Sequence, residues 1–120
     1  MMRLVGIPWG KKSPPEEANC LTLAIYAQKI LWSREVNLDM GVDWTDETLR
    51  IRSHEIEKEI ARFAIKIDEP EPGDVGIIET CGYCHLVTFV SPDRILHTIL
   101  DGKSRISRLR RKEVSAWRVQ

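Results

Sequence analysis

The stretch HLVTFVSPDRILHT, residues 85–98, decides the expected fold. Two short runs rich in β-branched residues flank SPD, a cluster of turn-forming residues. This pattern predicts a β-hairpin, in which His85 and His97 could be cross-strand neighbours. Short runs of the same kind, VGIIE, SRISRL and AWRV, lie on either side of it. The C-terminal half is therefore expected to form an antiparallel sheet.

The N-terminal half has helical patterns instead. Residues 19–32, NCLTLAIYAQKILW, are apolar nearly all round, which is typical of a buried helix. Asn19 can cap this helix and leave Cys20 in its first turn. From Thr45, apolar residues recur at spacings of three, four or seven up to Ile67, which predicts a second, amphipathic helix that ends before DEPEPGD. Helices followed by strands predict a single α+β domain over residues 1–120.

Composition excludes several classes of protein. The formal net charge is zero, so we expect no nucleic-acid partner. Three cysteines do not suit a disulfide scaffold. The N-terminus lacks the apolar run of a signal peptide, and no run approaches the ~18 apolar residues of a membrane helix. We therefore expect a protein made in the cytoplasm without a signal peptide and without membrane insertion.

The segment CGYCH, residues 81–85, invites three other interpretations. Haem attachment would require export and a second axial ligand, and a redox dithiol would precede a helix, whereas a strand is expected here. Zinc would need a second pair of ligands with regular spacing, so it is kept only as a weaker alternative that uses Cys81 and Cys84. We expect no metal and no cofactor, with both cysteines acting as small apolar side chains at a hairpin.

One thiol and two imidazoles form a candidate catalytic set. A cysteine nucleophile needs a base and a group that orients the base, and a helix N-terminus favours its thiolate. Cys20 satisfies the last condition if Asn19 is the cap. His85 at the start of one strand could then be the base, and His97 on the next strand could orient it.

Several motifs in chain order resemble the NlpC-type cell-wall cysteine peptidases. The opening LVGIPWGKKSPPEEANCLTLAIYA is similar to the family segment in which a G-x-P-aromatic sequence precedes the catalytic cysteine. EPGDVGII resembles the family's lead into its first central strand, and residues 85–98 resemble its histidine strand and the strand after it. The short chain looks most like versions found in phage and prophage tails.

The resemblance implies a papain-like α+β fold, in which N-terminal helices pack on a small antiparallel sheet. It implies an enzyme that hydrolyses amide bonds in peptidoglycan stem peptides, with Cys20 as nucleophile, His85 as base and His97 as its orienting group. Trp9 and Asn19 would bind substrate. Other phage tail proteins would be partners, and the protein would be incorporated in a virion tail.

Three positions depart from the family pattern and keep an alternative open. Asn19 replaces an aspartate, Leu21 replaces a small residue, and Trp9 replaces a tyrosine. The alternative is a structural module of phage tail assembly in which this catalytic site is impaired.

Overall fold

Strands predominate in the part of the chain that the structure describes. The computed structural model describes residues 4–10, 12–36, 57–58, 60–80, 83–98, 102–109 and 114–120, with the backbone alone at residues 79–80 and 83–85. Its elements, in chain order, are α1 (Cys20–Trp32), β1 (Ala64–Ile67), β2 (Val75–Thr80), β3 (Tyr83–Ser91), β4 (Arg94–His97), β5 (Arg105–Arg108) and β6 (Val114–Val119).

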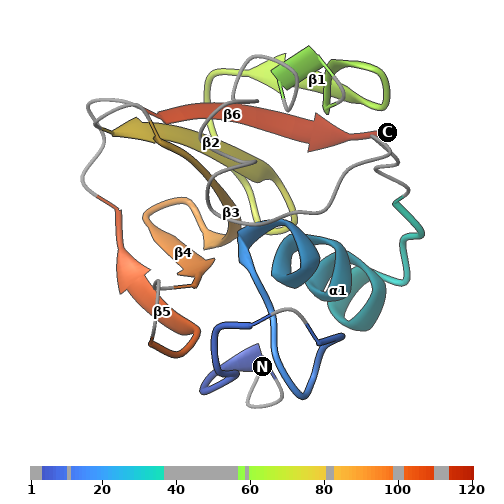
Figure 1. Cartoon of the computed structure of the whole chain (residues 1–120). Helices are drawn as coiled ribbons and strands as arrows, with labels where there is room; N and C mark the ends of the chain where they lie inside the picture. The colour runs from blue at the N-terminus through green and yellow to red at the C-terminus, as the bar shows by residue number, and fades with distance from the viewer. Residues whose placement is uncertain are drawn as a thin grey trace.

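The six strands form one antiparallel sheet in the order β1-β6-β2-β3-β4-β5. The predicted hairpin is present as β3 and β4, with Thr88 opposite Leu96. The C-terminal strand β6 does not follow the chain order, because it inserts between β1 and β2. Figure 1 shows the sheet curving from β1 and β6 at the top to β4 and β5 at the lower left. Since β3 has a paired strand on each side, it lies inside the sheet.

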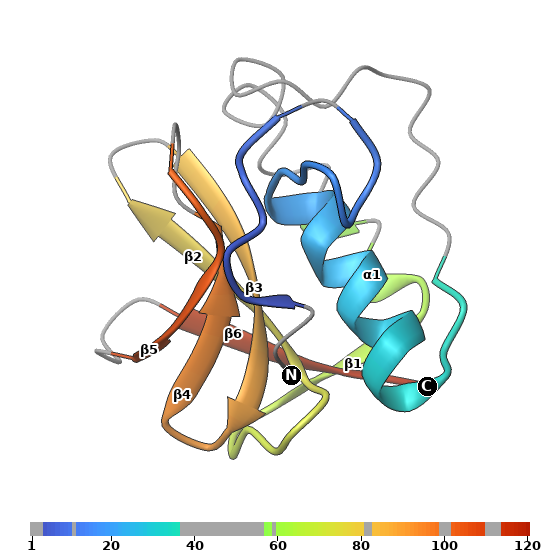
Figure 2. The same cartoon turned by 90° about the horizontal axis from the view of Figure 1, so that it is seen from below.

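The helix α1 covers one face of this sheet and contacts β3 and β4 (Figure 2). Leu23 and Ala27 of α1 belong to an apolar cluster with Leu96 of β4. Leu86 of β3 belongs to a second cluster on the same face, which contains Ala24 of α1. Burial of these side chains holds the helix on the sheet, since each fully buried leucine contributes about 1.5–3 kcal/mol.

The opposite face of the sheet has an apolar cluster of its own. Side chains alternate between the two faces along a strand, so Val87 and Phe89 of β3 lie on this second face. They pack with Ile95 of β4 and with Leu109 and Ala116. Both faces of β3 are therefore buried, and every residue from 86 to 89 is less than 4% exposed.

The fold class predicted from the sequence is wrong. We expected an α+β, papain-like (NlpC-type) domain in which N-terminal helices pack on a small antiparallel sheet. The described residues instead form a small, mostly β domain, in which one helix with defined ends packs on a sheet of six strands. The sheet, rather than a set of helices, makes up most of the core.

The difference is clearest at residues 63–67, which the periodicity assigned to the second helix. Most of that predicted helix lies outside the described residues, although residues 57, 58, 60 and 61 are helical. Ala64–Ile67 form β1 and pair with Ala116–Val119 of β6. Over so short a stretch, the same apolar positions fit both a helical and a strand pattern. Residues 64–67 form a strand because β6 provides backbone hydrogen-bond partners for them.

The segment before β2 joins three elements through a buried carboxylate. Asp74 is 2% exposed, and its Oδ2 accepts a hydrogen bond from the backbone N–H of Glu71 at 2.8 Å. Arg118 of β6 donates to both oxygens of this carboxylate at 3.1 Å, which raises the pKa of Arg118. Gly73, with a φ of 95°, accepts a hydrogen bond from Nε2 of Gln28 in α1 at 2.9 Å. These contacts tie α1, β2 and β6 together.

We expect Gly76→Ala in β2 to lower the free energy of unfolding by about 1–3 kcal/mol, because overpacking a filled core has a cost of this size. The new Cβ would lie 2.8 Å from Cγ2 of Val87 and 3.0 Å from Cε2 of Phe89. Urea denaturation measures the change. Gly10→Ala is the matched control, because its Cβ would meet the flexible side chain of Glu17. An equal loss in both variants would contradict the packing argument.

Candidate active site

The predicted nucleophile, Cys20, is the first residue of α1. Oδ1 of Asn19 accepts a hydrogen bond from the backbone N–H of Thr22 at 2.8 Å, and Oγ1 of Thr22 accepts one from the backbone N–H of Asn19 at 2.9 Å. This reciprocal pair is a capping box. It holds Cys20 at the positive end of the helix dipole, an environment that favours a thiolate over a thiol.

The side chain of Cys20 lies in the core beneath the helix. Cys20 and the next residue, Leu21, are each 2% exposed. Both belong to the apolar cluster that contains Leu86 of β3. The thiol is therefore on the face of the sheet that α1 covers, with little contact with solvent.

The segment before α1 places Trp9 next to the start of the helix. Trp9 and Ala18 form a parallel bridge, in which the backbone N–H of Ala18 donates to the carbonyl of Pro8 at 3.0 Å. Trp9 is half-buried, whereas Asn19 is 6% exposed and uses its Oδ1 in the helix cap. The predicted substrate-binding residues are thus close along the backbone, and substrate binding by them stays a prediction.

The predicted base, His85, is described by its backbone alone. It lies in β3 opposite Ile78 of β2, and its side chain is outside the described residues. Because residues two apart in a strand lie on the same face, position 85 lies on the face of Val87. Val87 belongs to the cluster on the face away from α1. The neighbouring Leu86 belongs to the cluster that contains Cys20. The alternation therefore assigns position 85 to the face of the sheet opposite the one on which Cys20 is buried.

The predicted orienting group, His97, ends β4 and lies opposite Arg105 of β5. Its Nε2 is 2.7 Å from Oγ of Ser107, also in β5. Because the preceding Leu96 packs toward α1, His97 lies on the other face of the sheet. The described contacts therefore join His97 to Ser107, a residue that we did not predict. The alternation in RILH and RISR could have indicated it, had the pairing of these strands been known.

The two histidines are diagonal neighbours rather than a direct pair. Continuing the register of Thr88 opposite Leu96 sets His97 level with Val87, two residues along β3 from His85. Diagonal positions on one face are within reach of long or aromatic side chains. In Figure 2, α1 and β3 both begin in the upper half of the view. The register instead sets His97, the last residue of β4, level with Val87 in the middle of β3, so it does not bring the three predicted catalytic residues to one end of the sheet.

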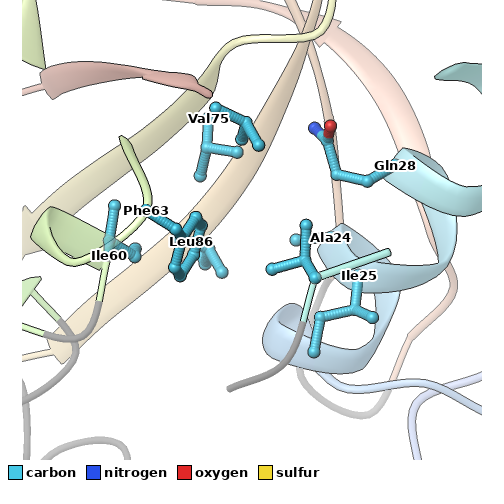
Figure 3. Close-up of a pocket in the computed structure, with 9 residues that line it drawn as sticks. Ala24, Ile25, Gln28, Ile60, Phe63, Val75 and Leu86 are labelled. Carbon is cyan, nitrogen blue, oxygen red and sulfur yellow. The ribbon is translucent and has the colours of Figure 1, made fainter. Parts of the chain in front are cut away.

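A pocket of about 250 Å³, which includes space open to solvent, lies further along α1. Figure 3 shows Ala24, Ile25 and Gln28 of the helix facing Ile60 and Phe63 across it. The lining is apolar except for Gln28, whose Nε2 and Oε1 both make hydrogen bonds. The pocket therefore offers packing surface rather than a catalytic group.

The described residues were searched for metal-binding groups and for membrane-spanning helices. No group of three or more histidine, cysteine, aspartate or glutamate residues there is arranged to hold a metal ion. None of the helices in that part is long and apolar enough to cross a membrane. Cys81 and the side chain of Cys84 lie outside the described residues. Zinc binding by these two cysteines therefore stays an alternative prediction.

No model of a protein family matches the chain, and no curated protein matches it. The resemblance to the NlpC-type peptidases therefore depends on the short motifs themselves.

We expect Asn19→Ala to lower the free energy of unfolding by about 0.5–2 kcal/mol, the usual cost of removing a helix N-cap. Asn19→Asp keeps the acceptor and adds a negative charge at the positive end of the dipole, so it should cost little or nothing. Urea denaturation of both variants measures the difference. An Asp variant as unstable as the Ala variant would show that the Oδ1–Thr22 hydrogen bond is not what stabilises this end.

Proposed function

We propose that this protein is a cysteine hydrolase that cleaves amide bonds in peptidoglycan stem peptides, with Cys20 as its nucleophile. The capping box at Asn19 and Thr22 is the observation that supports this most, because it sets the thiol at the N-terminus of a 13-residue helix. A reactive cysteine needs such an electropositive position. The substrate class is taken from the resemblance to the NlpC-type peptidases.

In the proposed reaction, His85 takes the proton of the Cys20 thiol and the thiolate attacks the amide carbonyl carbon. Backbone N–H groups in the first turn of α1 hydrogen-bond the resulting oxyanion. The tetrahedral intermediate collapses to a thioester, and His85 delivers the proton to the departing amine. Water, deprotonated by His85, then hydrolyses the thioester, which releases the acid and restores the thiol.

His97 holds the ring of His85 in this proposal. Their diagonal register across β3 and β4 supports the assignment, since it sets both on one face of neighbouring strands. Trp9, whose backbone lies against the residue before Asn19, would border the substrate. Incorporation in a virion tail, with other tail proteins as partners, would bring such an enzyme to the cell wall.

A second candidate function is that of a structural module in phage tail assembly, without hydrolase activity. The burial of Cys20 and Leu21, each 2% exposed, favours it. The alternation along β3 favours it as well, because it places position 85 on the face away from α1. In this case the thiol contributes only to the core, as most buried cysteines do.

Alkylation of each cysteine with iodoacetamide over a range of pH, followed by peptide mass spectrometry, separates the two functions. If the protein is a hydrolase, Cys20 labels below neutral pH, and His85→Ala slows this labelling at pH 6 by about tenfold or more, because the thiol returns toward its ordinary pKa of ~8.5. Wild-type protein should also release new amino groups from purified peptidoglycan, whereas Cys20→Ala should not.

His54→Ala is the matched control, because His54 has no role in the proposed site and its loss should leave the labelling of Cys20 unchanged. Cys81 and Cys84 serve as internal references in each sample. A wild-type Cys20 that is inert, or that titrates like an ordinary thiol, rejects the hydrolase and leaves the structural module.

A further inference from the structure

A hydroxyl–imidazole pair lies on the face of the sheet away from α1. Oγ of Ser107 in β5 and Nε2 of His97 in β4 are 2.7 Å apart, and both residues are half-buried. This distance is at the short end of the range for a side-chain hydrogen bond. The ring of His97 is therefore held through one identified nitrogen.

The register explains why these two side chains meet. Ser107 is directly opposite Ile95, and His97 is directly opposite Arg105. Ser107 and His97 are thus diagonal partners on one face of the β4–β5 pair. Ile95 is 4% exposed and belongs to the apolar cluster of that face. A valine or isoleucine at position 107 would extend this cluster, whereas serine provides a hydroxyl for the imidazole.

The tautomer of His97 decides what its other nitrogen can do. A neutral imidazole carries one N–H and one lone pair. A group that orients a catalytic histidine accepts a hydrogen bond from the N–H of that histidine. If His97 does this for His85 through Nδ1, then Nδ1 carries the lone pair and Nε2 carries the proton. Nε2 must then donate to Oγ of Ser107.

We propose that Ser107 is a positioning residue of the candidate active site: its hydroxyl accepts the Nε2–H of His97 and so fixes both the tautomer and the orientation of that ring. This inference depends on the proposed hydrolase function. It extends the site by one strand, since Ser107, His97 and His85 then occupy the successive strands β5, β4 and β3 on one face. Ser107 acts through His97 and does not touch substrate.

The test compares wild type with Ser107→Ala, Ser107→Thr, His97→Ala and the Ser107→Ala/His97→Ala double variant. Two quantities are measured in each: the ¹⁵N chemical shifts of the histidine rings, which report the tautomer, and the pH profile of Cys20 alkylation. Ser115→Ala is the control, because Ser115 is also a half-buried strand serine with a side-chain hydrogen bond, here to Trp117.

The inference predicts one dominant Nε2–H tautomer of His97 in wild type and a mixture in Ser107→Ala. The same variant should slow Cys20 alkylation at pH 6 by about threefold to tenfold, the effect of losing one hydrogen bond. Ser107→Thr should restore both quantities, since threonine keeps the hydroxyl. In the His97→Ala background, Ser107→Ala should have no additional effect, and Ser115→Ala should change neither quantity.

An unchanged His97 tautomer in Ser107→Ala overturns the inference, whatever Cys20 does. A changed tautomer with an unchanged Cys20 profile, while His97→Ala does slow the alkylation, shows that Ser107 is structural only, and the hydrolase proposal survives. If wild-type Cys20 reacts as an ordinary thiol, the hydrolase proposal fails. A tautomer shift in Ser107→Ala then still supports Ser107 as the residue that fixes His97, and its absence overturns this part as well.

Discussion

The rest of the structure depends on the alternation of β3 between two buried faces. Residues 86–89 are buried on both sides, so a shift of one residue in register would exchange the two apolar clusters and disrupt both. This constraint fixes the position of β4 through Thr88 and Leu96, and that of β2 through Val75. It also assigns His97 and position 85 to one face of the sheet and the residues that pack under α1 to the other.

The segment PGD, residues 72–74, adds contacts between elements that are distant in sequence. Gly73 turns the chain with a positive φ and accepts a hydrogen bond from α1, while the next residue, Asp74, binds Arg118 of β6. A buried carboxylate is stable here because it has both a backbone donor and a guanidinium partner. The insertion of β6 between β1 and β2 is thereby supported by side chains as well as by backbone pairing.

Local signals in the sequence were sufficient for the parts of the fold that are themselves local. The cap at Asn19, the helix from Cys20 and the hairpin around SPD all follow from neighbouring residues. The strand β1 could not be predicted in this way, because its partner β6 lies about fifty residues away. The pair Ser107–His97 was missed although its residues are only ten apart in the sequence, because it requires the register between β4 and β5. The sequence placed Cys20 in the first turn of the helix, but its burial depends on packing in the cluster that contains Leu86 of β3, which local signals do not show.

Two geometric facts about the candidate site oppose a direct contact between the thiol and the predicted imidazoles. Alternation assigns the thiol and the two histidine positions to different faces, which opposes direct contact across the middle of a sheet. The register opposes it as well, because His97, the last residue of β4, lies level with Val87 in the middle of β3 rather than at an end of that strand. The proposed hydrolase would therefore need a rearrangement that brings the thiol and an imidazole together, whereas the structural module needs none.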